Sequence, residues 1–230
     1  MRGGVSAAVA AIALLAAPAG AAPMDPANPT CPPSPNWGPS TPMRFTLDKR
    51  GNQRILLAEG GIDDNLVPRL QDALKANAPI DEIWLRSPGG NARVGNEAGK
   101  IIRQSQLPTR IPQGWACFSA CNFLFMGGWA RTVDQGGLFI VHMFTHTANR
   151  AQIESQVLRG TDSTVGMIGD IEQDSALLAS EDNDFLIRMG VSRKLLTDVM
   201  YQQKAVGGST RRCLTNAEAV NYGVDNMTKS

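Results

Sequence analysis

The chain has 230 residues, of which 22 are Lys or Arg and 21 are Asp or Glu, so its formal net charge at pH 7 is only +1. It contains no basic block and no basic helix face, which argues against nucleic acid and anionic lipid as partners. A chain of this length can form one domain with a well-developed hydrophobic core.

The first residues have the three-part pattern of a secretory signal peptide. Arg2 supplies a positive charge, residues 5–17 form an uncharged apolar run, and Ala19 and Ala21 are small residues before a cleavage point. The run is shorter than the ~20 residues that span a bilayer. We therefore predict a signal peptide at 1–21, a periplasmic or secreted product, and no membrane span after processing. A retained anchor or a loose N-terminal helix is the alternative.

Residues 22–42 hold eight of the 14 prolines in the chain. Proline has no backbone N–H to donate to a strand ladder or a helix, so this segment is predicted to be an extended arm or linker. A single domain is then expected at 43–230.

Apolar residues beyond this point alternate between the period of strands and the period of helices. Strands are predicted at 44–47, 54–58, 82–85, 109–115 and 138–141. Helices are predicted after a cap at Asp63 or Asp64, across 94–102, and from Cys121 to a stop at Gly127 and Gly128. This alternation predicts an α/β domain with parallel strands.

The C-terminal part has a helical pattern. Residues 151–189 are expected to be helical with a break within 160–169, and Ser192 is expected to cap a helix at 194–203. Thr215 and Glu218 have the spacing of a capping box for the last helix.

Four cysteines allow three full disulfide pairings, among which the sequence cannot choose. They are Cys31, Cys117, Cys121 and Cys213. An exported protein reaches an oxidising compartment where such residues pair, and a bond from Cys31 to the body would pin the arm. Zinc is the rival interpretation of the 117/121 pair, but the chain has only two histidines and no second close ligand pair. We expect no metal and no cofactor.

Two side chains are candidates for catalysis. Ser119 lies between a predicted strand and an apolar helix, where backbone N–H groups are unpaired and a hydroxyl can act as a nucleophile. Serine is also a common helix cap without further function. His142 ends an apolar strand, the place where α/β folds put functional side chains, and its imidazole can act as a general base. Its alternative is a hydrogen-bonded structural histidine, and His146 is a weaker competing base.

The motif Ser87-Pro88-Gly89-Gly90 follows a predicted strand. Paired glycines let the backbone approach a ligand closely, and their N–H groups can bind a peptide or an oxyanion. An ordinary turn is the alternative.

Together these motifs resemble the Clp-protease proteolytic subunit (ClpP) family within the crotonase-like superfold. Ser-Pro-Gly-Gly lies 32 residues before Ser119, and His142 lies 23 residues after it. The segment 214–225, with its Tyr-Gly and acidic ending, is similar to the closing helix of the family. The resemblance covers about 55–225. It implies a spiral of β-β-α units and a possible homo-oligomer. It also implies a Ser119 nucleophile, a His142 base, and an oxyanion hole from the N–H groups of Gly90 and Ala120, beside Gly89.

The sequence departs from the family at the acid of the catalytic triad. Arg211 stands where the resemblance places an aspartate. Losing that acid can cost ~10⁴ in rate. Asp198 is one possible substitute, a serine–histidine dyad is another, and a dead site is the third. A serine–lysine dyad is less favoured because Lys194, the first lysine after the serine, lies in a different part of the fold.

Three functions follow from these observations. The leading one is an exported serine peptidase. The signal peptide and the Cys-x-Ser-Ala-Cys motif resemble the exported branch of the ClpP-like proteins more than the cytosolic protease. The second is a catalytically degenerate envelope protein of the same fold that binds a peptide or a partner. Crotonase-type chemistry on an acyl thioester is the third, and export argues against it because coenzyme A is a cytosolic carrier.

Overall fold

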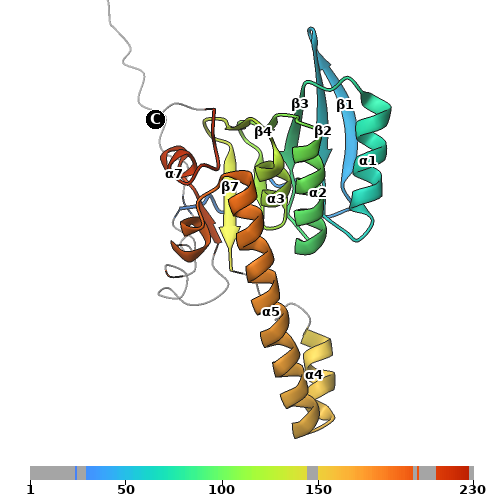
Figure 1. Cartoon of the computed structure of the whole chain (residues 1–230), viewed down its shortest axis with the longest axis vertical. Helices are drawn as coiled ribbons and strands as arrows, with labels where there is room; N and C mark the ends of the chain where they lie inside the picture. Colours follow the sequence, from blue (N-terminus) through green and yellow to red (C-terminus); the bar gives the residue numbers. More distant parts are fainter. Residues whose placement is uncertain (1–23, 25–29, 144–149, 199–200, 202–210, 228–230) are drawn as a thin grey trace, which may run out of the picture.

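The computed structural model describes residue 24 and residues 30–143, 150–198, 201 and 211–227 (Figure 1). The predicted signal peptide at 1–21 and His146 lie outside these residues. Within them, no helix is long and apolar enough to cross a membrane.

Five strands form the larger sheet, in the order β1-β2-β3-β4-β6. Their bounds are β1 (Arg44–Arg50), β2 (Gln53–Glu59), β3 (Glu82–Arg86), β4 (Thr109–Ile111) and β6 (Arg131–Val133). β1 and β2 form an antiparallel hairpin, whereas β2, β3, β4 and β6 run parallel. Helices lie side by side on one face of this sheet (Figure 1). They are α1 (Leu66–Asn77), α2 (Ala92–Gln104) and α3 (Cys121–Gly127). The predicted mixed α/β fold is therefore confirmed.

A smaller sheet has the order β5-β7-β8. It contains β5 (Ala116–Phe118), β7 (Leu138–His142) and β8 (Arg211–Cys213), with β7 parallel to β5 and antiparallel to β8. The strand predicted at 109–115 begins correctly but is too long: β4 ends at Ile111, and β5, in the other sheet, begins only at Ala116. Pro112 separates them: it has no N–H for a ladder, and its carbonyl accepts the N–H of Trp115 in a turn.

Helix ends agree with the sequence at one site and differ at another. The Thr215–Glu218 capping box is present at the start of α7 (Asn216–Asn221). The predicted aspartate cap of α1 is wrong, since the N-cap is Asn65, without a side-chain cap. The Asp63 carboxylate instead accepts the N–H of Asn65 and pairs with Arg69.

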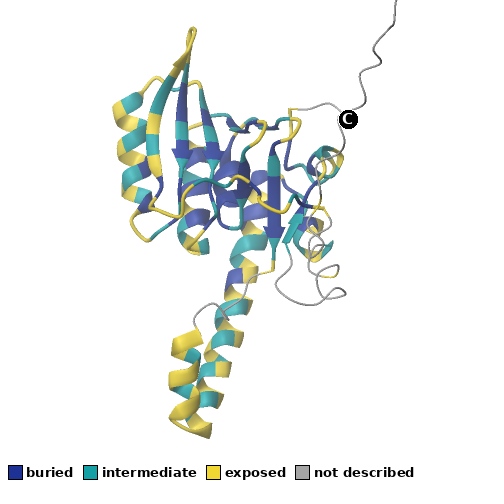
Figure 2. Ribbon diagram, turned by 180° about the vertical axis from the view of Figure 1, so that it is seen from behind, coloured by how far each residue is buried: buried dark blue, intermediate teal, exposed yellow. Residues whose placement is uncertain are grey.

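The predicted helical region is a hairpin of α4 (Arg150–Leu158) and α5 (Thr161–Met189). The break lies at Gly160, whose φ is 106°, and Gly166 and Gly169 are within α5. The hairpin extends away from the body and is largely exposed (Figures 1 and 2). The C-terminal half of α5 returns to the core, where Phe185 packs edge-on against Phe123 of α3. Residues 194–198 form a further short helical segment.

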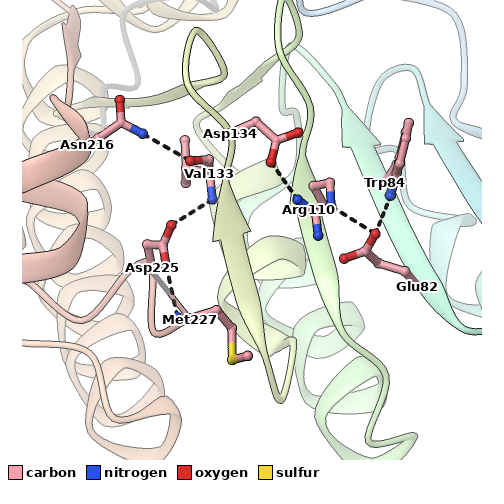
Figure 3. Close-up of polar contacts among 8 residues, drawn as sticks. All are labelled: Glu82, Trp84, Arg110, Val133, Asp134, Asn216, Asp225 and Met227. Carbon is pink, nitrogen blue, oxygen red and sulfur yellow. Dashed lines mark hydrogen bonds and ion pairs between the residues drawn. The ribbon is translucent and has the colours of Figure 1, made fainter. Parts of the chain in front are cut away.

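The C-terminal segment closes the core next to β6. The Asp225 carboxylate accepts the N–H groups of Val133 and Met227, while Arg110 bridges Asp134 and Glu82 on neighbouring strands (Figure 3). Arg131 is buried, and it donates to the carbonyls of Met126 and Gly128 at the end of α3 and of Gly223 and Val224 after α7. Desolvation lowers the pKa of Arg131 to about 10, so it remains charged at neutral pH.

Two disulfides are present. Cys31 bonds to Cys213 of β8, which ties the proline-rich segment to the body, and Cys117 bonds to Cys121 across the turn between β5 and α3. The cysteines of the second bond are therefore not zinc ligands.

The two bonds are expected to differ in their contribution to stability. In the chain-entropy model a disulfide stabilises more when it closes a longer loop. The 182-residue separation of Cys31 and Cys213 corresponds to about 5 kcal/mol, and the four-residue separation of the other pair to about 2 kcal/mol. Urea unfolding of the Cys31→Ser/Cys213→Ser and Cys117→Ser/Cys121→Ser proteins measures both losses. The reverse ranking would contradict the expectation.

Candidate functional site

Ser119 lies on a sharp turn between β5 and α3. Its φ is +57°, in the left-handed region that side chains other than glycine seldom adopt. Two backbone hydrogen bonds hold the turn: the Ser119 N–H donates to the Ile140 carbonyl at 3.3 Å, and the Ser119 carbonyl accepts the N–H of Asn122 at 2.9 Å. A strained backbone that its surroundings hold in place is common at functional sites and rare elsewhere.

Two further contacts fix this turn from its flanks. The Cys117–Cys121 disulfide joins the strand before Ser119 to the helix after it. The buried side chain of Asn122 donates to the same Ile140 carbonyl at 2.8 Å and so ties α3 to β7. The disulfide was one of the pairings that the sequence left open, whereas nothing in the sequence singled out Asn122.

The glycine motif lies directly against this turn. A Cβ on Gly89 would approach the Phe118 carbonyl oxygen to 2.6 Å and the Ser119 Cβ to 2.7 Å, so only glycine allows the observed packing. The buried Ser87 hydroxyl accepts the Gly89 N–H at 3.0 Å and holds the loop. Ser87 also pairs with Cys117 of β5. The structure thus brings the motif and Ser119 together.

Two backbone donors near Ser119 are unused. Gly90 is exposed, and its neighbours Gly89 and Asn91 bond with Ile62, which leaves its own N–H outside that ladder. Among the described residues, neither the N–H of Gly90 nor that of Ala120 donates a hydrogen bond. Unpaired amide groups beside a serine are the arrangement that can receive an oxyanion.

His142 ends β7 and faces the serine. Its Nε2 lies 2.7 Å from the Ser119 Oγ, within hydrogen-bonding distance. Burial lowers the pKa of His142 below its ordinary value, and a hydrogen bond to the backbone of Met143 acts in the opposite direction. A bond that raises the pKa of histidine is one in which the ring donates to an oxygen. A tautomer with its proton on Nδ1 would leave the Nε2 lone pair free to accept the serine proton.

The described residues place no carboxylate in a hydrogen bond or ion pair with His142. Arg211 is the residue opposite His142 in the β7–β8 ladder. Its guanidinium donates to the Pro33 carbonyl at 3.2 Å and lies 5.4 Å from the ring centroid of Trp37. Asp198, the substitute acid considered from the sequence, accepts a hydrogen bond from the Tyr222 hydroxyl at 2.8 Å.

A small cavity lies beside Gly90. Its volume is about 240 Å³, and it is bounded by the start of α2 and by Asp174 and Leu178 of α5. Arg93 of α2 pairs with Asp174 at 2.8 Å at this cavity.

No protein-family model matches the chain, and no curated protein matches it either. Among solved structures, the chain is similar to a mutant of ClpP1 from Listeria monocytogenes, at 16% identity and a TM-score of 0.46. The similarity covers 75% of this chain and 92% of that chain. Membership of the family therefore stays a prediction, and the chemistry of the site has to be inferred from its own geometry.

Gly89→Ala is expected to displace the Ser119 turn, because the added Cβ meets backbone and side-chain atoms of that turn. Gly51→Ala is the matched control: its φ is also positive, at +61°, but an added Cβ there meets nothing within 4 Å. Both substitutions carry the left-handed cost of about 1–2 kcal/mol. In urea unfolding we expect a clearly larger loss for Gly89→Ala, and equal losses would contradict the contact.

Proposed function

We propose that the protein is an exported serine hydrolase, a peptidase with Ser119 as nucleophile and His142 as general base. The observation that carries the proposal is the 2.7 Å contact between Ser119 Oγ and His142 Nε2. A strained turn, a histidine with a depressed pKa and two unpaired amide donors around that contact support it. The proposal includes the ClpP-like spiral arrangement of a single domain at 43–230, preceded by the arm at 22–42.

In the proposed reaction, Ser119 Oγ attacks a peptide carbonyl while His142 Nε2 takes its proton. The oxygen of the tetrahedral intermediate accepts hydrogen bonds from the N–H groups of Gly90 and Ala120. The imidazolium returns the proton to the leaving amine, and water then hydrolyses the acyl-enzyme by the same base. Each proton removed in one step is returned in the next.

The Met143 backbone takes the orienting role that a carboxylate has in a triad. A carbonyl can hold the Nδ1–H tautomer, which leaves Nε2 free for the serine. It carries no full negative charge, so it stabilises the imidazolium less than an aspartate does. We therefore expect a slow enzyme, because replacing the acid of a triad lowers the rate by up to ~10⁴.

An extended peptide is the proposed substrate. The exposed Gly90 backbone offers main-chain contacts, and the cavity beside it can take one side chain of modest size. Disulfides are typical of an oxidising compartment, which supports a periplasmic or secreted location. A homo-oligomer stays a prediction of the family resemblance.

A binding module without catalysis is the second candidate. The observation in its favour is Arg211, whose positive charge lies opposite His142 where an acid would serve catalysis. Such a protein would bind a peptide at the same loop without cleaving it.

Labelling with a fluorophosphonate separates the two candidates. We expect the mature protein to be labelled on one serine, the label to disappear in Ser119→Ala, and the rate to fall by about 10²–10⁴ in His142→Gln. Ser105→Ala is the control, since this serine is exposed at the end of α2 and remote from the chemistry proposed. Intact-protein mass spectrometry measures the fraction of protein that carries the label. A wild-type protein that stays unlabelled across pH 5–9 would favour the binding module.

The pH dependence of labelling tests the base. Burial disfavours the charged imidazolium, so His142 stays neutral to a lower pH than an unperturbed histidine. The labelling rate should rise with pH and reach half its maximum below 6.5, the ordinary value. A midpoint well above 6.5 would mean that another group controls the reaction.

A further inference from the structure

The smaller sheet is covered by apolar groups on both faces. Phe139 and Val141 of β7 and Cys117 of β5 join the main core. The alternate residues belong to a second cluster with the proline-rich segment; its members are Cys31, Trp37, Ala116, Phe118, Leu138, Ile140 and Cys213. Successive side chains on a strand point to opposite faces, so His142 shares the second face with Ile140 and Leu138. Within the arm, residues 30–37 therefore cover the face of the sheet on which His142 lies.

The arm is bonded to both outer strands of this sheet, β5 and β8. The Ala116 N–H of β5 donates to the Asn36 carbonyl at 2.8 Å, and the Cys213 N–H of β8 donates to the Thr30 hydroxyl at 3.1 Å. The disulfide joins Cys31 to Cys213, which is opposite Ile140 of β7. These bonds place the arm in a fixed position.

A row of aromatic rings runs from the arm to the histidine. The Trp37 ring stacks on Phe118 with centroids 5.5 Å apart and planes 26° apart, and Phe118 lies 4.7 Å from the imidazole centroid of His142. The Arg211 guanidinium lies 5.4 Å from the centroid of the Trp37 ring and donates to the Pro33 carbonyl. The arginine at the expected acid position is thus engaged with the arm.

We propose that the arm is part of the site, with Trp37 as a positioning residue that holds His142 toward Ser119 through Phe118. The inference rests on the proposed function for its catalytic consequence. It assigns Arg211 a role as an anchor of Trp37, in place of the orienting role that an acid would have. Trp37 does not touch the reacting atoms, and its effect passes through the Phe118 ring.

The contacts give a physical reason for this role. Phe118 is half-buried, and its ring contacts both Trp37 and His142. Without the indole, Phe118 can rotate into the vacated space and water can reach the imidazole. An imidazole free to turn loses the 2.7 Å contact with Ser119 for part of the time, and a misplacement of about 1 Å can cost ~10² in rate.

The test compares Trp37→Ala with Trp37→Phe, which restores a stacking ring. Trp129→Ala is the matched control, because this tryptophan is 62% exposed and belongs to neither apolar cluster. We expect Trp37→Ala to lower the maximal rate constant of fluorophosphonate labelling at least tenfold with little change in inhibitor affinity. Trp37→Phe should recover most of the loss, and the control should react like the wild type.

A second readout does not depend on activity. The chain has two histidines, so NMR titration of their ring protons can be assigned with a His146→Gln protein. Arg211 is the charged residue opposite His142 from β8, whereas Phe118 of β5 and Trp37 of the arm carry no charge. Removing the indole hydrates the imidazole and also frees Arg211 from the ring, so the titration is made in an Arg211→Gln background. There the His142 pKa should rise toward 6.5 in Trp37→Ala and stay low in Trp37→Phe.

The outcomes separate the two proposals. A wild-type protein that is not labelled defeats the proposed function, and the titration still decides whether Trp37 positions His142. An unchanged pKa together with an unchanged rate in Trp37→Ala overturns the inference. If Trp37→Ala does not fold, Phe118→Leu replaces it: it removes the intermediate ring and keeps an apolar side chain, and it should lower the rate and raise the pKa in the same way.

Discussion

The packing of β7 between two apolar layers is the constraint on which the site depends. One face of the strand belongs to the main core, and the other is covered by the arm. The register of the strand is set by its two ladders, in which Ile140 lies opposite Phe118 of β5 and Cys213 of β8. That register decides which residue ends the strand facing Ser119. The position of His142 is therefore a consequence of core packing several residues away.

The Ile140 carbonyl links this packing to the nucleophile. It accepts both the Ser119 N–H and the Asn122 side-chain amide. The strained turn at Ser119 is thus held by a residue of the strand that also carries His142, two positions further on. Any shift of β7 along its axis moves His142 and the anchor of Ser119 together. This common support explains how a left-handed serine, which costs about 1–2 kcal/mol, can persist.

The sequence predicted the mixed α/β fold and the region of each helix because apolar periodicity reports local burial. It also singled out Ser119 and His142 as candidates, since a serine before a helix and a histidine at the end of an apolar strand are local patterns. It did not separate β4 from β5, because periodicity does not say to which sheet a strand belongs. Asn122 had no local signal: its partner is 18 residues away along the chain. The pairing of the cysteines likewise depends on distances that only the fold sets.

The proline-rich segment shows the limit of composition as a guide. Its many prolines predict an extended chain, and that prediction says nothing about what the segment covers. Cys31 was the one residue within it that suggested a bond to the body, whereas Trp37 drew no attention, and both lie in the cluster behind the small sheet. Once the arm is in place, an arginine at position 211 gains a carbonyl and an aromatic ring as partners. A carboxylate there would be repelled by that carbonyl and by the negative face of the ring. The arm in this position therefore disfavours an acid at residue 211. A protein that keeps the arm has to orient its histidine by other means, and the Met143 backbone and the Phe118 ring are the contacts that His142 has for this purpose.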